Sequence, residues 1–210
     1  MEVLQKYGLS LKPEKCEFKK TSVEYLGVVV SHDTVKMDPA KVARVLEWPT
    51  PSNKKEVQSF LGFKNNFYQR FIEGFSHITW PLFNLTKVDS AFKWSSEEKS
   101  AFDILKDRIT SALILALPDN SRPYCVEADS SYFATGAILS QENPDDGKWH
   151  PVAFLSKSLS PVEKNYEIHD KEMLAIVQAL EEWRHFLEGT EHQFEIWMDH
   201  KNLEYFMMAK

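Results

Sequence analysis

The stretch RPYCVEADSSYFATGAILSQ, residues 122 to 141, contains two apolar runs separated by a carboxylate, Asp129, and a few small polar residues. Both runs are short and rich in residues that favour β-strands, so the stretch predicts two neighbouring strands. Asp129 could be a turn residue between them. It could equally be one member of a set of acids that the fold brings together from distant parts of the chain.

The pattern continues from residue 113 onward. Strands are expected in YCVEAD, ATGAILSQ and HPVAFLSK; a helical region is expected from Ser160 to Gly189, and a last strand, HQFEIWMDH, contains Asp199. In sheets of this kind, sites form at strand ends. If the first and last strands are parallel neighbours joined through the helix, Asp129 and Asp199 meet at one sheet edge.

Glu172 lies near the start of the predicted helix. At helical spacing it shares a face with Ile176, Ala179 and Trp183, the face expected to pack on the sheet. A carboxylate in such a stripe costs free energy unless something compensates it. Three crowded acids repel one another, and a divalent cation such as Mg²⁺ reverses this because it prefers hard oxygen ligands.

Each acid also has an ordinary explanation. An aspartate at a strand end is commonly a turn or cap residue, and Glu172 could simply favour the helix dipole. Asp170 and Glu167 compete with Glu172 for the same role. The pair Asp145-Asp146 in ENPDDGK is interpreted as part of a turn, because its neighbours are turn formers.

The first 112 residues have a different character. Strands, in a hairpin, are expected in KCEFKKTSVEYLGVVVSHDTVKMD, and helices in PAKVARVLEW, TPSNKKEVQSFLGFKNNFYQRFI, FSHITWPLFNLTK and WSSEEKSAFDILKDRITSA. Asn53 is expected to cap the second helix and Ser95 the fourth, and Pro81 to break the third. We therefore expect three segments, 1–37, 38–112 and 113–210.

Composition narrows the functional class. The chain has 210 residues, 43% of them apolar, and a net charge of -6, which argues mildly against a purely electrostatic nucleic-acid binder but suits an enzyme that holds metal ions. Two cysteines without metal spacing favour a reducing, intracellular compartment. No apolar run approaches the ~18 residues of a membrane span, and no secretory signal is present, so no membrane partner is expected. Both ends look cut, which predicts a segment of a longer polypeptide.

These residues resemble a known family. The motifs that carry the resemblance are KCEF, VEYLGVVVS, MDPAKVARVLEWPTP, VQSFLGFKNNFYQRFI, PLFNLTK, FKWSSEEKSAFDILK, EADSSYFATGAILSQ, YEIHDKEMLAIVQALEEWRHFLEG and MDHKNLEYF. Together they resemble the part of a gypsy-type LTR-retrotransposon Pol polyprotein that runs from the end of the reverse transcriptase palm into RNase H. The resemblance implies an α/β (α+β) fold with a palm-end, primer-grip hairpin, a helical thumb and connection, and an RNase H-like mixed sheet with a helix.

The resemblance also implies residue roles. It places the catalytic metal ligands, for Mg²⁺ with Mn²⁺ as the alternative ion, on Asp129, Glu172 and Asp199. It implies an RNA–DNA hybrid or template–primer duplex and the rest of the Pol polyprotein as partners. The residues expected to meet phosphates or sugars of the duplex are Lys64, Asn65, Tyr68 and Arg70. For Tyr68, a place in the helical core is an equal alternative.

Two departures from the family pattern limit these expectations. The polymerase motif Tyr-x-Asp-Asp is absent, so no polymerase site is expected. The family's fourth aspartate falls further along than Lys210, which predicts weak or absent RNase H activity. Two other functions stay open: a non-catalytic nucleic-acid- or protein-binding remnant of a decayed element, and a carboxylate-metal enzyme of another type, such as an integrase-like strand transferase.

Overall fold

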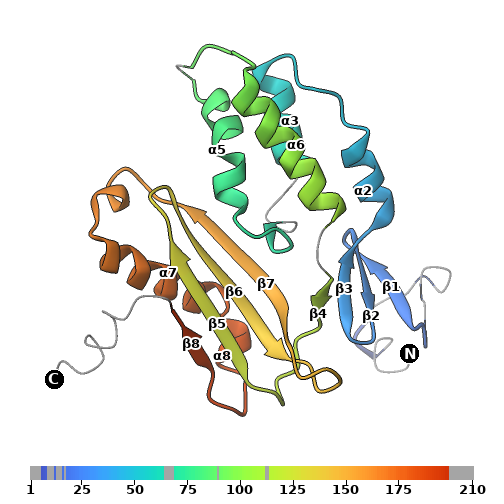
Figure 1. Cartoon of the computed structure of the whole chain (residues 1–210). Helices are drawn as coiled ribbons and strands as arrows, with labels where there is room; N and C mark the ends of the chain where they lie inside the picture. The colour runs from blue at the N-terminus through green and yellow to red at the C-terminus, as the bar shows by residue number, and fades with distance from the viewer. Residues whose placement is uncertain are drawn as a thin grey trace.

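The computed structural model describes residues 6–8, 12, 16, 18–63, 69–88, 90–111 and 114–198. Within them the chain forms two four-stranded sheets, with a group of helices beside the first sheet and further helices packed on the second (Figure 1). The predicted mixed fold, strands then helices then a mixed sheet with a helix, is confirmed.

The first sheet has the order β1-β2-β3-β4, and all its neighbours are antiparallel. Its strands are β1 (Ser22–Tyr25), β2 (Val28–Ser31), β3 (Thr34–Met37) and β4 (Leu115–Ala116). The β1–β2 turn has positive φ at Leu26 and Gly27, 50° and 92°; Gly27 adopts this conformation without strain, whereas it is uncommon for a residue with a side chain such as Leu26. The predicted hairpin is present, and β4 joins it from nearly 80 residues downstream. The segment boundaries at residues 37 and 112 remain predictions.

Between β3 and β4 the described residues form four helices, and two of them begin with the predicted caps. The four helices are α2 (Pro39–Leu46), α3 (Lys54–Phe63), α5 (Phe75–Thr86) and α6 (Ser96–Thr110). The Asn53 side chain accepts a hydrogen bond from the Glu56 backbone N–H at 3.0 Å. Ser95 and Glu98 form a reciprocal capping box. These caps satisfy backbone donors that a helix N-terminus leaves without partners.

The prediction that Pro81 breaks the third helix is wrong. Helix α5 runs through Pro81 from Phe75 to Thr86. Proline removes one backbone hydrogen bond, but α5 buries Thr79 before Pro81 and Leu82 and Leu85 after it. Burial of this face on both sides of the proline outweighs the local penalty, because tertiary packing supplies most of a helix's stability.

The helices and the first sheet share one apolar core. Phe60 and Phe102 are almost fully buried, and their ring centroids lie 4.5 Å apart. Val35 of β3 and Leu105 of α6 belong to the same cluster. Burying one such side chain stabilises the fold by roughly 1.5–3 kcal/mol, so this cluster holds the helices against the strands.

The second sheet has the order β7-β6-β5-β8. Its elements are β5 (Tyr124–Ser130), β6 (Ala134–Glu142), β7 (Trp149–Ser158), the 3-10 turn η2 (Glu163–Asn165), α7 (Ile168–Glu182), α8 (Arg184–Leu187) and β8 (Glu195–Trp197). Strands β5, β6 and β7 form an antiparallel meander, and β8 pairs with β5 in parallel. Asp145 and Asp146 lie in the β6–β7 turn, as predicted.

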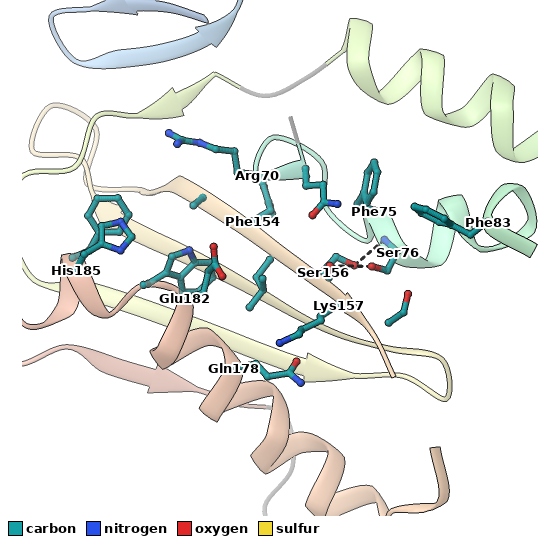
Figure 2. Close-up of a pocket in the computed structure, with 16 residues that line it drawn as sticks. Arg70, Phe75, Ser76, Phe83, Phe154, Ser156, Lys157, Gln178, Glu182 and His185 are labelled. Atoms are coloured by element: carbon teal, nitrogen blue, oxygen red, sulfur yellow. Dashed lines mark hydrogen bonds between the residues drawn. The ribbon is translucent and has the colours of Figure 1, made fainter. Parts of the chain in front are cut away.

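Helix α7 covers one face of this sheet. Val126 and Leu139 from the strands pack with Ala175 and Ala179 of α7 in a second apolar core. The free edge of β7 meets the helical part of the chain. There, the Phe154 N–H donates to the Arg70 carbonyl at 3.0 Å. The Ser76 backbone N–H donates to the Ser156 hydroxyl, and the Ser76 hydroxyl donates to the Ser156 carbonyl, each at 2.9 Å (Figure 2). The second sheet is therefore fixed to the helices along β7.

Candidate functional site

Asp129 lies close to the end of β5 and is exposed. Its carboxylate accepts a hydrogen bond from the Ser130 N–H at 2.7 Å. Because side chains alternate across a strand, Asp129 shares a face with Glu127, while Ala128 points to the face that α7 covers. Asp129, Glu127, Glu73 and other residues line a hollow of about 590 Å³.

Two acids beside Asp129, Glu127 and Glu73, were not predicted from the sequence. Glu127 precedes Asp129 by two residues, so strand alternation alone could have placed both acids on one face. Glu73 belongs to the segment just before α5, and nothing in its local sequence pattern indicates that it lies beside β5.

Glu172 lies in the second turn of α7 and is 7% exposed. It belongs to the predicted stripe, in which Ile176, Ala179 and Trp183 are also buried. The helix packs against β5 and β6. The competing acids of the helix start are exposed, so Glu172 is the acid that α7 turns toward the sheet.

The start of α7 and the end of β5 lie at the same end of the sheet. The Lys171 ammonium is 5.5 Å from the ring centroid of Tyr132, which follows Asp129 by three residues. Figure 1 shows the tips of β5 and β8 at that end as well. The topology therefore brings the predicted acid-bearing segments into one region of the molecule.

Asp199 lies outside the described residues. Strand β8 pairs with β5 so that Trp197 is opposite Glu127, and the next residue, Met198, lines the hollow of Asp129. Among the described residues, no group of three or more His, Cys, Asp or Glu side chains could hold a metal ion. Because Asp199 was not among them, the three-carboxylate assignment stays a prediction.

The donors near Asp129 fit a hydrated divalent cation. Asp129 presents exposed, hard oxygen ligands to a roomy hollow. The hydroxyl of the next residue, Ser130, is buried and has no hydrogen-bond partner within the described part of the chain, but strand alternation places it on the face that α7 covers, away from the hollow of Asp129. A buried hydroxyl without a partner is uncommon in proteins and calls for an ordered water or ion.

Of the four residues predicted to contact nucleic acid, only Arg70 is described; Lys64, Asn65 and Tyr68 lie outside. Arg70 is half-buried, its guanidinium carbon is 5.7 Å from the Phe71 ring centroid, and burial lowers its pKa. It lines a hollow of about 730 Å³ between α5, β7 and the α7–α8 region (Figure 2). A contact of Arg70 with a duplex remains a prediction.

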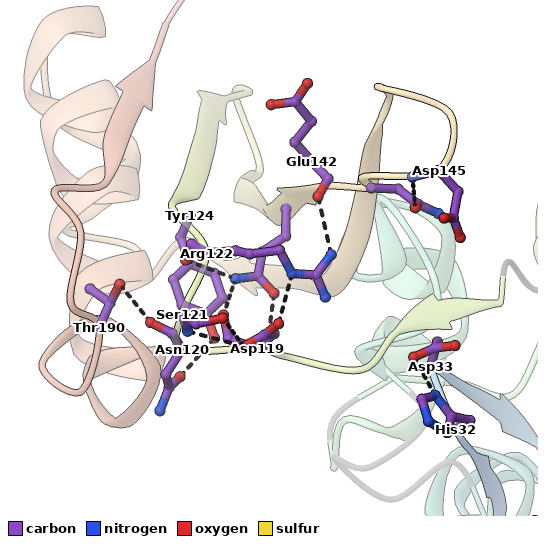
Figure 3. Close-up of polar contacts among 12 residues, drawn as sticks. His32, Asp33, Asp119, Asn120, Ser121, Arg122, Tyr124, Glu142, Asp145 and Thr190 are labelled. Carbon is purple, nitrogen blue, oxygen red and sulfur yellow. Dashed lines mark hydrogen bonds and ion pairs between the residues drawn. The ribbon is translucent and has the colours of Figure 1, made fainter.

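The opposite end of β5 is held by a polar cluster (Figure 3). Gln141, 1% exposed, accepts from the Asp119 N–H at 2.9 Å and donates to the carbonyls of Asp119 and Arg122 at 2.7 and 3.1 Å. The Tyr124 hydroxyl contacts the Asn120 side chain at 3.1 Å. The Asn120 carbonyl in turn accepts from the Glu191 N–H at 3.3 Å, just before β8. This cluster fixes where β5 and β8 begin.

A mixed sheet with one parallel pair and a helix on its face is the arrangement of an RNase H-like fold. Residues 94–196 match the family described as "RNase H-like domain found in reverse transcriptase". The Tf2-3 and Tf2-4 transposon polyproteins of Schizosaccharomyces pombe are each 38% identical over 205 residues, covering 96% of this chain. The chain spans 15% of the length of these relatives.

Solved structures show the same fold. A foamy viral protease–reverse transcriptase in complex with double-stranded DNA matches 100% of this chain and 36% of its own, with a TM-score of 0.78 and 20% identity. Another, in complex with RNA/DNA hybrid, matches 93% of this chain and 26% of its own, with a TM-score of 0.75 and 21% identity. The predicted relationship is confirmed: the chain is homologous to the reverse transcriptase/RNase H segment of gypsy-type LTR-retrotransposon polyproteins.

A search of the described residues finds no helix that is both long and apolar enough to cross a membrane.

Proposed function

We propose that Asp129, Glu172 and Asp199 form a divalent-metal centre that hydrolyses the RNA strand of RNA–DNA hybrids. The observation that most supports this is the parallel pairing of β5 with β8. Paired parallel strands keep a constant register, and Glu127 is opposite Trp197 in this pair. Asp129 and Asp199 each follow these residues by two positions in the sequence, so continuation of the same register would make them neighbours.

The burial of Glu172 supports its part in the proposal. Glu172 lies on the face of α7 that packs against β5 and β6, so its carboxylate is held beside the sheet. In the proposal, Mg²⁺, or Mn²⁺ in its place, would be bound by Glu172 together with the two aspartates, because these ions prefer hard oxygen ligands. Lys171 and Glu172 are both about nine-tenths buried, so the start of α7 is rigidly placed against the sheet.

In this proposal the carboxylates divide the work. Asp129 would be shared by two ions, while Glu172 and Asp199 would each hold one and orient the attacking water. When bound, such ions stabilise negative charge on the phosphodiester and activate water. Asp129 is accessible to a large substrate, because it is exposed on the surface of the sheet.

The solved structures with the same fold support a proposal for the substrate and partners. One of the similar foamy viral enzymes is in complex with RNA/DNA hybrid and another with double-stranded DNA. We propose the same classes of ligand here, an RNA–DNA hybrid and a template–primer duplex, with Lys64, Asn65, Tyr68 and Arg70 along the duplex. The rest of a Pol polyprotein would be the protein partner, in an intracellular setting.

Metal binding tests the centre directly. Wild-type protein is melted in EDTA and in increasing Mg²⁺ or Mn²⁺. An ion at a hundred times its dissociation constant stabilises the fold by about 2.7 kcal/mol. For a chain of this size that corresponds to a rise of roughly 5–10 °C in melting temperature.

Asp129→Asn should lose most of this rise. Asp145→Asn, which changes an exposed aspartate in the β6–β7 turn, should keep it. An equal response of wild type and Asp129→Asn would show that the metal does not bind at this centre. Hydrolysis is tested with a labelled RNA–DNA hybrid beside single-stranded RNA. Cleavage should require metal, prefer the hybrid and disappear in Asp129→Asn; metal binding without any cleavage would favour a non-catalytic binding module.

A further inference from the structure

Aromatic and basic side chains gather on one surface beside the end of β5. They come from α5 and the residue that follows it, from the β5–β6 turn and from η2, three segments far apart in the sequence. We call them the aromatic–lysine surface; its members are Trp80, Lys87, Tyr132, Phe133 and Lys164. The structure thus joins the helical part of the chain to the RNase H-like sheet at this point.

Trp80 is the centre of the aromatic–lysine surface. The Lys164 ammonium lies 4.1 Å from the centroid of the Trp80 ring, and the Lys87 ammonium lies 5.3 Å from it. Phe133 lies beside Trp80, with 5.8 Å between ring centroids. Both ammonium groups are therefore within the range of cation–π attraction, which holds positive charge against this surface.

Tyr132 extends the surface toward Asp129. Its side chain is 66% exposed, and its ring meets the edge of Phe133 with 4.9 Å between centroids. The Lys171 ammonium lies 5.5 Å from the Tyr132 ring centroid. The ring is thus supported on one side by its neighbours while most of it remains open to solvent, three residues from Asp129.

The chemistry of this surface suits a particular class of ligand. Exposed rings stack on flat groups, and the ammonium groups attract negative charge; an unpaired stretch of nucleic acid offers both. Bases inside a duplex already stack on each other, so an exposed ring at a loop tip gains most from an unpaired base. An apolar protein partner fits less well, since it would have to remove water from the ammonium groups of Lys87 and Lys164.

We propose that the aromatic–lysine surface binds a single-stranded segment of nucleic acid next to the metal centre, with Tyr132 stacking on a base and Lys164 attracting the backbone. The proposal deepens the proposed function and rests on it for the class of polymer. It adds a contact for unpaired nucleotides that adjoin the hybrid, separate from the duplex contacts expected of Arg70.

Binding without metal tests this surface independently of catalysis. A fluorescent single-stranded oligonucleotide is titrated with the full chain in EDTA, and its anisotropy is followed. Tyr132→Ala should weaken binding by about tenfold, and Tyr132→Phe should leave it nearly unchanged, because stacking needs the ring and not the hydroxyl. Lys164→Glu should weaken binding and reduce its dependence on salt.

Two matched controls keep the result specific. Tyr166 is also exposed, 42%, but it lines a different hollow with Asp170, Met173 and Leu174. Tyr166→Ala and Lys148→Ala, the latter an exposed lysine after the β6–β7 turn, should bind as wild type does. Melting curves establish that each variant is folded.

The possible outcomes separate this proposal from the proposed function. Equal binding by wild type and Tyr132→Ala overturns the proposal even if the hybrid is cleaved. Equal losses in Tyr132→Ala and Tyr166→Ala also overturn it, because the effect would then be unspecific. A selective loss in Tyr132→Ala supports the surface, even if the chain binds no metal and cleaves no hybrid.

Discussion

Replacing Gln141 with leucine should destabilise the RNase H-like sheet measurably. The side chain is buried and makes three hydrogen bonds to the backbone of Asp119 and Arg122. At about 1 kcal/mol each, their loss costs about 3 kcal/mol. Leucine has a similar size and regains about 1 kcal/mol by burying apolar surface. The net decrease in the free energy of unfolding should therefore be about 2 kcal/mol.

Urea denaturation, followed by circular dichroism and tryptophan fluorescence, measures this change. With a slope of about 2 kcal/mol per M, the midpoint of Gln141→Leu should fall by about 1 M. Gln178 is the matched control, since it is a buried glutamine that accepts one hydrogen bond, from Thr135 at 2.6 Å. Gln178→Leu should lie close to wild type. Equal midpoints for the two variants would refute the reasoning that the three backbone contacts set the cost.

Other predictions concern the remaining parts of the chain. Ser95→Ala should lower the free energy of unfolding by about 1 kcal/mol by removing half of the capping box with Glu98, as thermal melting can measure. Burial raises the pKa of the Cys125 thiol to about 12, so a thiol reagent at pH 8 should label Cys16 but reach Cys125 only after unfolding. In the unfolded chain the Cys125 thiol has its ordinary pKa of 9.0, so it ionises at a lower pH there than in the folded chain. The contribution of the neutral Cys125 thiol to the free energy of unfolding is therefore complete below pH 9 and declines above it. The chain should not extend a primer on a template, because residues 1–37 include a single aspartate, Asp33; labelled product above background would contradict this.

Local sequence patterns predicted the elements of the second sheet well. The alternation around Asp129 and the helical stripe of Glu172 each depend on neighbours a few residues away, which is the range over which periodicity is informative. The order of strands and helix along the chain then predicted the parallel pairing of β5 and β8, because a helical crossover is the common way to join parallel strands. The caps at Asn53 and Ser95 were predictable for the same local reason.

Contacts between distant segments could not be predicted in this way. Nothing near Leu115 indicates that β4 completes the first sheet, and nothing near Glu73 indicates a place beside Asp129. At Pro81 the local rule that proline breaks a helix gave a wrong prediction, because burial of α5 on both sides of the proline outweighs the local penalty. The aromatic–lysine surface could not be predicted locally either, since its residues come from three segments whose meeting depends on the whole fold.

The parallel pairing of β5 with β8 also bears on the order in which the proposed metal centre would assemble. Strands β5, β6 and β7 are joined by short turns and can pair as soon as they are synthesised, whereas β8 begins 65 residues after β5 ends. Closing so long a loop is slow relative to forming hairpins. We therefore expect the two strand-end aspartates to meet late, after α7 has docked. A chain still being synthesised would then lack the proposed metal centre until it has extended past β8.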